Sequence, residues 1–251
     1  MFHLLHVLLV SYLVACNALD RHFLRPISDS DLHPADGVSC ESWQFGVETN
    51  NVRDWKHVPN ACEDYIGHYM LGGHYRSDSA VVVTEAIKFA EAFELVGDGK
   101  DVWIFDVDET TLSNLPYYAA NGFGVEPYNS TAFNEWVNQS AAPALPESLK
   151  LYKKLLSLEI KVIFLTGRRE PTREATSTNL QSAGFHTWEK LLLKGVDVKT
   201  NSLVFKSGER KKLVEQGYRI VGNTGDQWSD LLGSPEGNRT FKLPDPMYYV
   251  A

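Results

Sequence analysis

The sequence lacks a basic cluster, a membrane-spanning hydrophobic run, an internal repeat and a low-complexity linker. Its 24 Lys and Arg stand against 32 Asp and Glu, which gives a formal charge of -8 and a pI near 5.5. It therefore offers no positive surface for the phosphates of nucleic acid. The charge does not exclude cationic partners or neutral or small anionic substrates. With 251 residues, 43% of them hydrophobic, the chain can bury one sizeable core.

The longest apolar run lies at the N-terminus. Residues 2–14 are almost wholly apolar but too few to cross a bilayer, and small residues follow around Ala15 and Ala18. This pattern predicts a secretory signal peptide over residues 1–18, and once it is cleaved no membrane association is expected. The run has no preceding Lys or Arg, which is atypical, and residues 13–16 also resemble a bacterial lipoprotein cleavage box. We favour the ordinary cleaved signal.

Cysteine is scarce, with three residues in the whole chain. Removal of the signal leaves Cys40 and Cys62, and an oxidising compartment favours one disulfide between them over two free buried thiols. Three Asn-x-Ser/Thr sequons, at Asn129, Asn138 and Asn238, fit a eukaryotic secretory route and predict N-glycosylation.

The order of predicted elements changes near residue 99. Residues 24–73 are mixed and are expected to be helical or irregular, and residues 81–95 fit an amphipathic helix that Gly97-Asp98-Gly99 ends. Beyond them we expect strands at 102–105, 161–165, 188–193, 203–205, 218–221 and 240–243, with helices at 146–158, 172–183 and 211–216. This alternation predicts an α/β fold with a mainly parallel sheet and helices on both faces. Ligands of such sheets bind beyond the carboxyl ends of the strands.

Polar residues directly follow two of these expected strands. Asp106 and Asp108 come after residues 102–105, and Thr166 and Gly167 come after residues 161–165. Two carboxylates in one turn can act as nucleophile and proton donor when their environments differ, and a Thr-Gly pair can donate hydrogen bonds to a phosphoryl oxygen. Taken alone, each motif also fits an ordinary polar turn or a helix cap.

Two further candidates follow later strands. Lys206 comes after residues 203–205 and can neutralise phosphate charge, although Lys194 competes for that role. Asp226 and Asp230 come after residues 218–221 and offer the hard oxygen ligands that suit Mg²⁺. A surface lysine and a surface acidic loop are the plain alternatives.

The joint order of these motifs resembles the haloacid dehalogenase superfamily. Within it, residues 105–118, 75–79, 142–146, 186–190 and 225–232 are similar to the plant acid phosphatases related to vegetative storage proteins. The resemblance runs from about Cys40 to the C-terminus. It implies a haloacid dehalogenase-like, Rossmann-like core over residues 99–251, an N-terminal helical layer over residues 19–98, and a lid inserted over about residues 112–144. Aromatic residues of that lid either line a pocket over the site or pack the insertion against the core: Tyr117, Tyr118, Phe123, Tyr128 and Trp136.

The same resemblance implies a mechanism for phosphate monoesters. Asp106 attacks phosphorus and forms an aspartyl-phosphate, and Asp108 protonates the leaving oxygen and later activates water. Asp106, the backbone carbonyl of Asp108 and Asp226 hold Mg²⁺, with Asp230 in support, while Thr166, Gly167 and Lys206 bind the transferred oxygens.

Rival functions follow from the same resemblance, because the family includes storage proteins with little or no activity. Some storage members replace the first acid of the pair, whereas this chain keeps Asp106, so we favour an active phosphatase. A phosphotransferase or a binding module that uses the same pocket is a second alternative. The resemblance also suggests a homodimer, and the signal is consistent with the cell wall, the extracellular space or the vacuole.

Overall fold

The computed structural model describes residue 37 and residues 39–251. The elements discussed below belong to one compact unit, residues 40–251. The expected signal peptide at residues 1–18 lies outside the described residues. Within the described part of the chain, no helix is both long enough and apolar enough to span a membrane.

A five-stranded parallel sheet forms the centre of this unit, in the order β3-β2-β1-β4-β5. The central strand β1 is buried along its whole length, as expected of a parallel strand covered on both faces. The strands are β1 (Asp101–Phe105), β2 (Lys161–Arg169), β3 (Lys190–Lys194), β4 (Arg219–Gly225) and β5 (Arg239–Lys242). The predicted α/β fold with a parallel sheet is confirmed.

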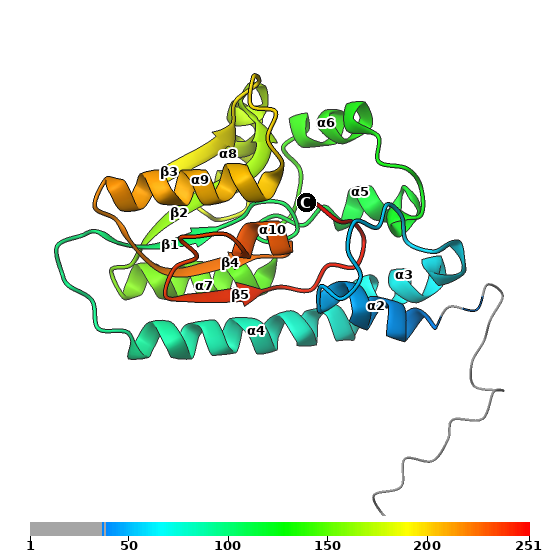
Figure 1. Cartoon of the computed structure of the whole chain (residues 1–251), viewed down its shortest axis with the longest axis horizontal. Helices are drawn as coiled ribbons and strands as arrows, with labels where there is room; N and C mark the ends of the chain where they lie inside the picture. Colours follow the sequence, from blue (N-terminus) through cyan, green and yellow to red (C-terminus); the bar gives the residue numbers. More distant parts are fainter. Residues whose placement is uncertain (1–36, 38) are drawn as a thin grey trace, which may run out of the picture. The chain divides into compact units, whose positions relative to one another are not determined.

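Helices cover both faces of the sheet (Figure 1). On one face α9 packs on a cluster that includes Val102, Ile104 and Ile163. On the other face α4 and α7 pack on each other and on the strands, where Phe89 of α4 contacts the Trp103 ring. The helices of the core are α4 (Gly73–Ala92), α7 (Pro146–Ser157), η3 (Glu170–Thr172), α8 (Arg173–Ser182), α9 (Ser202–Glu215) and α10 (Trp228–Leu231).

One predicted strand is wrong. Residues 203–205 lie in the first turn of α9, so Lys206 stands on a helix and does not follow a strand. The apolar triplet has the length of a buried strand, but the Asn201 side chain caps the helix by accepting a hydrogen bond from Val204 N at 2.9 Å. Phe205 and Leu213, eight residues apart, then fall on one buried helical face.

A second expectation was wrong in its bounds. The helix expected at residues 81–95 begins eight residues earlier, at Gly73, and ends at Ala92. Its first turns bury Tyr75 and Ser79, both on the face that meets the core. Polar residues lie between these two, so the sequence shows no clear apolar helical period in this segment.

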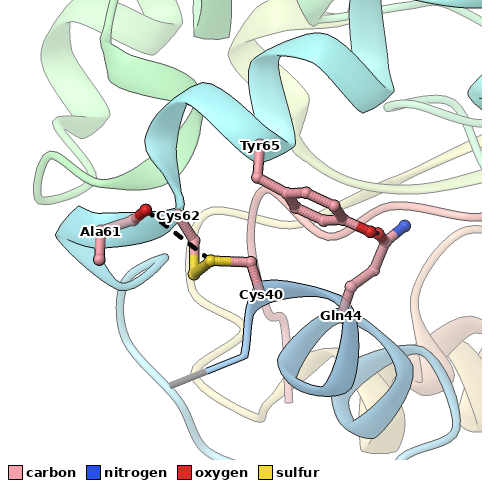
Figure 2. The surroundings of a disulfide bond; sticks show 5 residues. All are labelled: Cys40, Gln44, Ala61, Cys62 and Tyr65. Atoms are coloured by element: carbon pink, nitrogen blue, oxygen red, sulfur yellow. Dashed lines mark hydrogen bonds between the residues drawn. A yellow bond between two sulfur atoms is a disulfide. The ribbon is translucent and has the colours of Figure 1, made fainter. Parts of the chain in front are cut away.

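The N-terminal layer is stapled by the predicted disulfide between Cys40 and Cys62 (Figure 2). It consists of α2 (Cys40–Glu48), η1 (Asn60–Cys62) and α3 (Glu63–Leu71). Beside the bridge, the Tyr65 hydroxyl donates to Gln44 Oε1 at 2.8 Å. The far end of α2 docks on the core, because Trp228 Nε1 donates to the Glu48 carbonyl at 3.1 Å.

The segment between β1 and α7 is tied at its base by an antiparallel bridge between Leu112 and Ala144. It contains α5 (Leu115–Ala119), η2 (Gly122–Gly124) and α6 (Ser130–Asn138). Gly124 has φ 92° and a Cβ there would meet the Met247 carbonyl oxygen at 1.9 Å, so only glycine allows this close approach. The insertion is thereby joined to the C-terminal segment, whose end lies between α10 and α5 (Figure 1).

Candidate active site

The carboxyl end of β1 places Asp106 in the middle of the sheet edge. Its backbone N–H donates to the Thr224 carbonyl at 3.0 Å, which continues the pairing with β4 for one residue beyond the strand. The chain then turns through Glu109, a non-glycine residue with φ 47°. The Thr111 hydroxyl donates to the Asp106 carbonyl at 2.5 Å. The turn is therefore fixed by hydrogen bonds from within its own sequence.

Lys206 connects two of the predicted acids. Its ammonium donates to Asp106 Oδ1 and to Asp230 Oδ1, and the three side chains are only 4–6% exposed. We name Asp106, Lys206 and Asp230 the ion triad. Burial opposes the charge on Lys206, but the two carboxylates outweigh it and raise the lysine pKa. Burial and the neighbouring acids raise the pKa of Asp106 well above its ordinary value, against the opposing effect of Lys206.

Asp226 completes the acidic cluster from the end of β4. The residue before it is Gly225, where a Cβ would meet the Asp230 side chain at 2.4 Å. Asp226 Oδ1 accepts from the Thr110 hydroxyl at 2.9 Å and Oδ2 accepts from Gln227 Nε2 at 2.7 Å. Burial and the nearby Asp230 raise the pKa of Asp226 to about 6.

The cluster fits a divalent cation. Carboxylate oxygens of Asp106, Asp226 and Asp230 lie within 4.8 Å of one another, and all three residues are buried. Counted with Asp108, four carboxylates meet two cations, Lys206 and Arg168, which leaves two negative charges. Hard oxygen donors that repel one another in a buried site are the donor set that Mg²⁺ and Ca²⁺ prefer. The residues present can therefore hold a metal ion.

Asp108 points to a different partner. Arg168 Nε donates to both of its oxygens at 3.1 Å, Arg168 Nη2 donates to Oδ1 at 2.8 Å, and Asn114 Nδ2 donates to Oδ1 at 2.9 Å. Burial alone would raise the pKa of Asp108, but the charge and hydrogen bonds of Arg168, with that of Asn114, outweigh burial and lower it. The two acids of the pair thus have opposite electrostatic environments.

Thr166 and Gly167 lie inside β2, one strand away from Asp106. Phe164 pairs with Phe105, so Thr166 lies just beyond the level of Asp106 at the same edge. Thr166 is fully buried, and its Oγ1 accepts from the Arg168 N–H at 3.0 Å. The competing Lys194 is directed elsewhere, since its ammonium donates to the Thr200 carbonyl. The structure therefore favours Lys206 over Lys194 at the acidic cluster.

A second ring of buried polar residues holds the turn after β1. Glu109 Oε1 accepts from the Tyr75 hydroxyl at 2.6 Å, and Glu109 Oε2 accepts from Asn114 N at 2.7 Å. Burial raises the pKa of Glu109 to about 7, with Asp226 adding to the effect. Asp245, from the C-terminal segment, accepts from Gln227 Nε2 at 3.1 Å. These contacts link α4 and the C-terminal segment to the residues around Asp108 and Asp226.

Aromatic side chains of the inserted segment form a connected row. Tyr118 stacks on Tyr248 at a centroid distance of 5.2 Å and contacts Tyr117, which contacts Phe133, which contacts Tyr128. We name this row the aromatic wall. Burial raises the pKa of Tyr248, and the nearby carboxylates of Asp226, Asp245 and Asp108 add to the rise. The segment that carries Tyr248 is tied to the cluster, since Val250 N donates to Gln227 Oε1 at 3.0 Å and Gln227 Nε2 donates to Asp226. The wall therefore begins beside the acidic cluster. Phe123 instead packs on Gly67 of α3.

Several residues of the site are not evident from the sequence. Arg168 directly follows Thr166 and Gly167, so its position at the strand end is a usable signal, although the motif alone assigns it no role. Asn114 and Thr110 lie in the turn after β1 and carry no separate signal. Asp245 and Tyr248 come from a segment more than 130 residues away in sequence, and no local pattern links them to Asp108.

Comparison with known proteins identifies the family of the chain. A family model described as "HAD superfamily, subfamily IIIB (Acid phosphatase)" matches residues 27–251. "Acid phosphatase 1" of Solanum lycopersicum is 47% identical over 248 residues, which cover 97% of this chain and 97% of the relative. "Vegetative storage protein 2" of Arabidopsis thaliana is 44% identical over 215 residues, which cover 85% of this chain and 81% of the relative.

A solved structure supports the fold. The class C acid phosphatase from Bacillus anthracis superposes with a TM-score of 0.63 at 24% sequence identity. The match covers 76% of this chain and 86% of the bacterial chain. At this level of identity the likeness shows a shared fold and carries no statement about substrate.

Proposed function

Because the chain belongs to subfamily IIIB of the haloacid dehalogenase superfamily, the acid phosphatases, we propose that it hydrolyses small phosphate monoesters through Asp106 with the help of Mg²⁺. The ion triad is the observation that carries the proposal. Lys206 holds the Asp106 carboxylate at the carboxyl edge of the sheet, beside Asp226 and Asp230. Phosphoryl transfer depends mainly on positioning and charge neutralisation, and this arrangement supplies both.

The reaction proceeds in two displacements. An oxygen of the Asp106 carboxylate attacks phosphorus, the bond from phosphorus to the ester oxygen breaks, and that oxygen takes a proton from Asp108. The product is an alcohol and an aspartyl-phosphate. A water molecule then gives its proton to the Asp108 carboxylate and attacks phosphorus, which releases phosphate and restores Asp106. Thr166, Gly167 and Lys206 contact the transferred oxygens.

The pairing of Asp108 with Arg168 sets a condition on the first displacement. Asp108 donates a proton to the leaving oxygen, yet Arg168 stabilises its ionised form. The phosphate ester brings negative charge to the edge of the sheet where the Arg168 guanidinium binds Asp108. Competition of phosphate for Arg168 weakens its pair with Asp108 and favours the protonated acid.

The metal site supports this reaction electrostatically. Asp106, the backbone carbonyl of Asp108 and Asp226 would hold Mg²⁺, with Asp230 supporting them through Lys206. When bound, the ion neutralises the charge of the phosphoryl oxygens and of the clustered carboxylates. Asp106, whose pKa burial and the neighbouring acids raise, would be held in its ionised form as one of the ligands.

A storage function without catalysis is the second candidate, because a relative at 44% identity is named a vegetative storage protein. The ion triad argues against it, since a storage protein needs abundance and a stable fold but no buried acidic cluster. The two roles are compatible in one protein. The same proposal includes a secretory route, with delivery to the cell wall, the extracellular space or the vacuole. It also includes a homodimer and N-glycans at Asn129, Asn138 and Asn238.

The decisive experiment is hydrolysis of p-nitrophenyl phosphate by the wild type and by Asp106→Asn, at acidic pH, with and without EDTA. We expect the substitution to lower the rate by on the order of 10⁴-fold and EDTA to lower it in the wild type. Equal rates in the two proteins would overturn the mechanism, and indifference to EDTA would remove the metal. Phosphate release measured against product transfer at high alcohol concentration separates hydrolysis from phosphotransfer.

A further inference from the structure

Helix α6 carries a sequon at each end. Asn129 is the residue that caps its start and Asn138 is its last residue. Both are exposed, as is Asn238 before β5. The helix contacts α8 and η3, which directly follows Arg169 at the end of β2. A glycan on α6 would therefore stand on the insertion near the carboxyl edge of the sheet.

The cap at Asn129 is compatible with glycosylation. Its Oδ1 accepts from Thr131 N and Ala132 N, both at 3.1 Å. Glycosylation joins Nδ2 to the anomeric carbon of an oligosaccharide delivered as a lipid-linked diphosphate; Nδ2 loses one proton and the lipid diphosphate leaves. The carbonyl oxygen is untouched, so the helix keeps its cap and the glycan extends from the other atom of the amide.

Asn129 also lies at the outer end of the aromatic wall. The wall starts at Tyr248 and Tyr118 beside the acidic cluster and continues through ring contacts of 5.3–5.7 Å to Tyr128. Tyr128 precedes Asn129 and is 62% exposed. Through Phe133 the row connects Tyr128 to Tyr117, whose N–H donates to the Asn114 carbonyl at 2.9 Å, and Asn114 Nδ2 donates to Asp108 Oδ1 at 2.9 Å. Partial burial, with the Asp108 carboxylate adding to it, raises the pKa of Tyr128 to about 12. The sequon thus marks the rim of the active site.

We propose that an N-glycan on Asn129 stands at the rim of the active site and restricts it to compact phosphate monoesters, excluding phosphoryl groups carried on the surface of proteins. This inference rests on the proposed phosphatase function and adds its substrate class. An oligosaccharide is bulky and hydrated, so it obstructs a large partner at the rim. A small ester can still pass beside it along the aromatic wall. A phosphorylated protein has to approach over the same rim and meets the glycan first.

Asn238 provides a matched control, because its backbone N–H donates to the carbonyl of Ile220, early in β4. The acids of the site follow the opposite, carboxyl end of that strand. A glycan on Asn238 therefore stands at the far edge of the sheet and leaves access to the site unchanged. The two sequons differ in position relative to the site and share the same chemistry.

The test compares four proteins from a eukaryotic secretory host: wild type, Thr131→Ala, Asn129→Asp and Asn238→Gln. Thr131→Ala destroys the sequon and keeps the cap, which uses the Thr131 backbone and the Asn129 side chain. Asn129→Asp is a second variant that keeps Oδ1 and removes Nδ2, in case the first folds poorly. Peptide mapping by mass spectrometry reports occupancy, and kcat/KM is measured for p-nitrophenyl phosphate and for phosphorylated casein.

We expect both Asn129-sequon variants to gain severalfold in kcat/KM for casein while hydrolysing p-nitrophenyl phosphate as the wild type does. Asn238→Gln should match the wild type on both substrates. An unoccupied Asn129 in the wild type, or an unchanged ratio of casein to p-nitrophenyl phosphate activity after its sequon is lost, overturns this inference and leaves the phosphatase function standing. Absence of p-nitrophenyl phosphate hydrolysis in all proteins overturns both.

Discussion

Replacing Lys206 by methionine should reveal how much the ion triad contributes to folding and to catalysis. The ammonium touches Asp106 and Asp230, and none of the three side chains is more than 6% exposed. Methionine keeps most of the volume and removes the charge. Two buried carboxylates, with Asp226 close by, then lose their shared cation. Breaking a buried pair in this way costs about 3–5 kcal/mol of unfolding free energy.

The loss should depend on pH in a defined direction. The pKa of Asp106 is already raised in the folded wild type, and removal of the cation raises it further. A carboxyl group whose pKa is higher in the folded than in the unfolded protein stabilises the folded state at pH values below its unfolded pKa, which is about 3.9 for aspartate. This stabilisation is lost as the pH rises through the folded pKa. The destabilisation of Lys206→Met is therefore larger at pH 7 than at pH 4.

The assay is urea unfolding followed by tryptophan fluorescence, in EDTA so that metal binding does not contribute. A second substitution isolates the charge effect: Lys206→Met with Asp230→Asn removes one carboxylate and should be more stable than Lys206→Met alone by about 0.5–3 kcal/mol, the range of coupling between contacting residues. Activity toward p-nitrophenyl phosphate should fall on the order of 10²–10³-fold in both variants, the cost of one lost oxyanion donor.

Lys194→Met is the matched control for this experiment. Lys194 is also buried, at 7% exposure, but its ammonium donates to the Thr200 carbonyl. It should lose stability by about 1.5–3 kcal/mol, the contribution of a charged hydrogen bond, and keep its activity. If Lys206→Met unfolds at the wild-type urea concentration, or if adding Asp230→Asn restores nothing, the reasoning about the ion triad is refuted.

Three further predictions test other parts of the structure. Mg²⁺ should raise the melting temperature of the wild type, by a stabilisation of about 2.7 kcal/mol at 100 times Kd, and Asp226→Asn should abolish the shift; an equal shift in both proteins would place the metal elsewhere. Asp101→Asn keeps one side-chain acceptor but removes the charge that pairs with Arg219, whose Nε donates to Asp101 Oδ1 at 2.7 Å, and should cost about 1–3 kcal/mol at pH 7. Since Arg219 outweighs burial and lowers the pKa of Asp101, the difference from wild type should shrink as pH falls below about 4; a constant difference would contradict the ion pair. Cys40→Ser with Cys62→Ser opens a loop of sequence separation 22 and should lower the unfolding free energy, measured in urea, by about 3 kcal/mol relative to the oxidised wild type. The reduced wild type is the control and should match the variant.

The sequence is sufficient to place the acids of the site. An apolar strand followed directly by polar residues defines both an element and its functional end, which is why the residue pattern alone locates Asp106 at the carboxyl end of β1. The pattern predicts that Asp226 follows a strand at 218–221, and it lies directly after β4, which extends to Gly225. The parallel sheet then brings the two together, because β1 and β4 are neighbours.

The sequence is not sufficient to place Lys206 on its element. Residues 203–205 form a short apolar run that suits a strand as well as one turn of a helix, and periodicity cannot separate the two at that length. The decision comes from tertiary packing, since Phe205 and Leu213 pack in one cluster with Val102 of β1 and Ile163 of β2. Lys206, next to Phe205 on the helix, is thereby directed at the acids of the sheet edge.

The contacts of Asp108 are also out of reach of sequence reasoning. Its bidentate pair with Arg168 joins residues 60 positions apart, and the aromatic wall ends on Tyr248, 130 residues beyond Tyr118. Such pairs depend on how the insertion and the C-terminal segment fold over the sheet. The approach of Gly124 to the Met247 carbonyl, which excludes any side chain, shows that this fit is set by non-local packing.

Strand β1 begins and ends beside aspartates with opposite effects on stability. Asp101, at the amino end, pairs with Arg219, which lowers its pKa, so its ionised form stabilises the fold at neutral pH. Asp106, beyond the carboxyl end, is buried among other acids that raise its pKa, so its ionised form opposes folding. A phosphatase needs this second arrangement, because an acidic cluster that lacks a full set of cations is completed by a divalent ion. The buried acids that oppose ionisation of Asp106 are therefore the same groups that favour binding of a divalent ion.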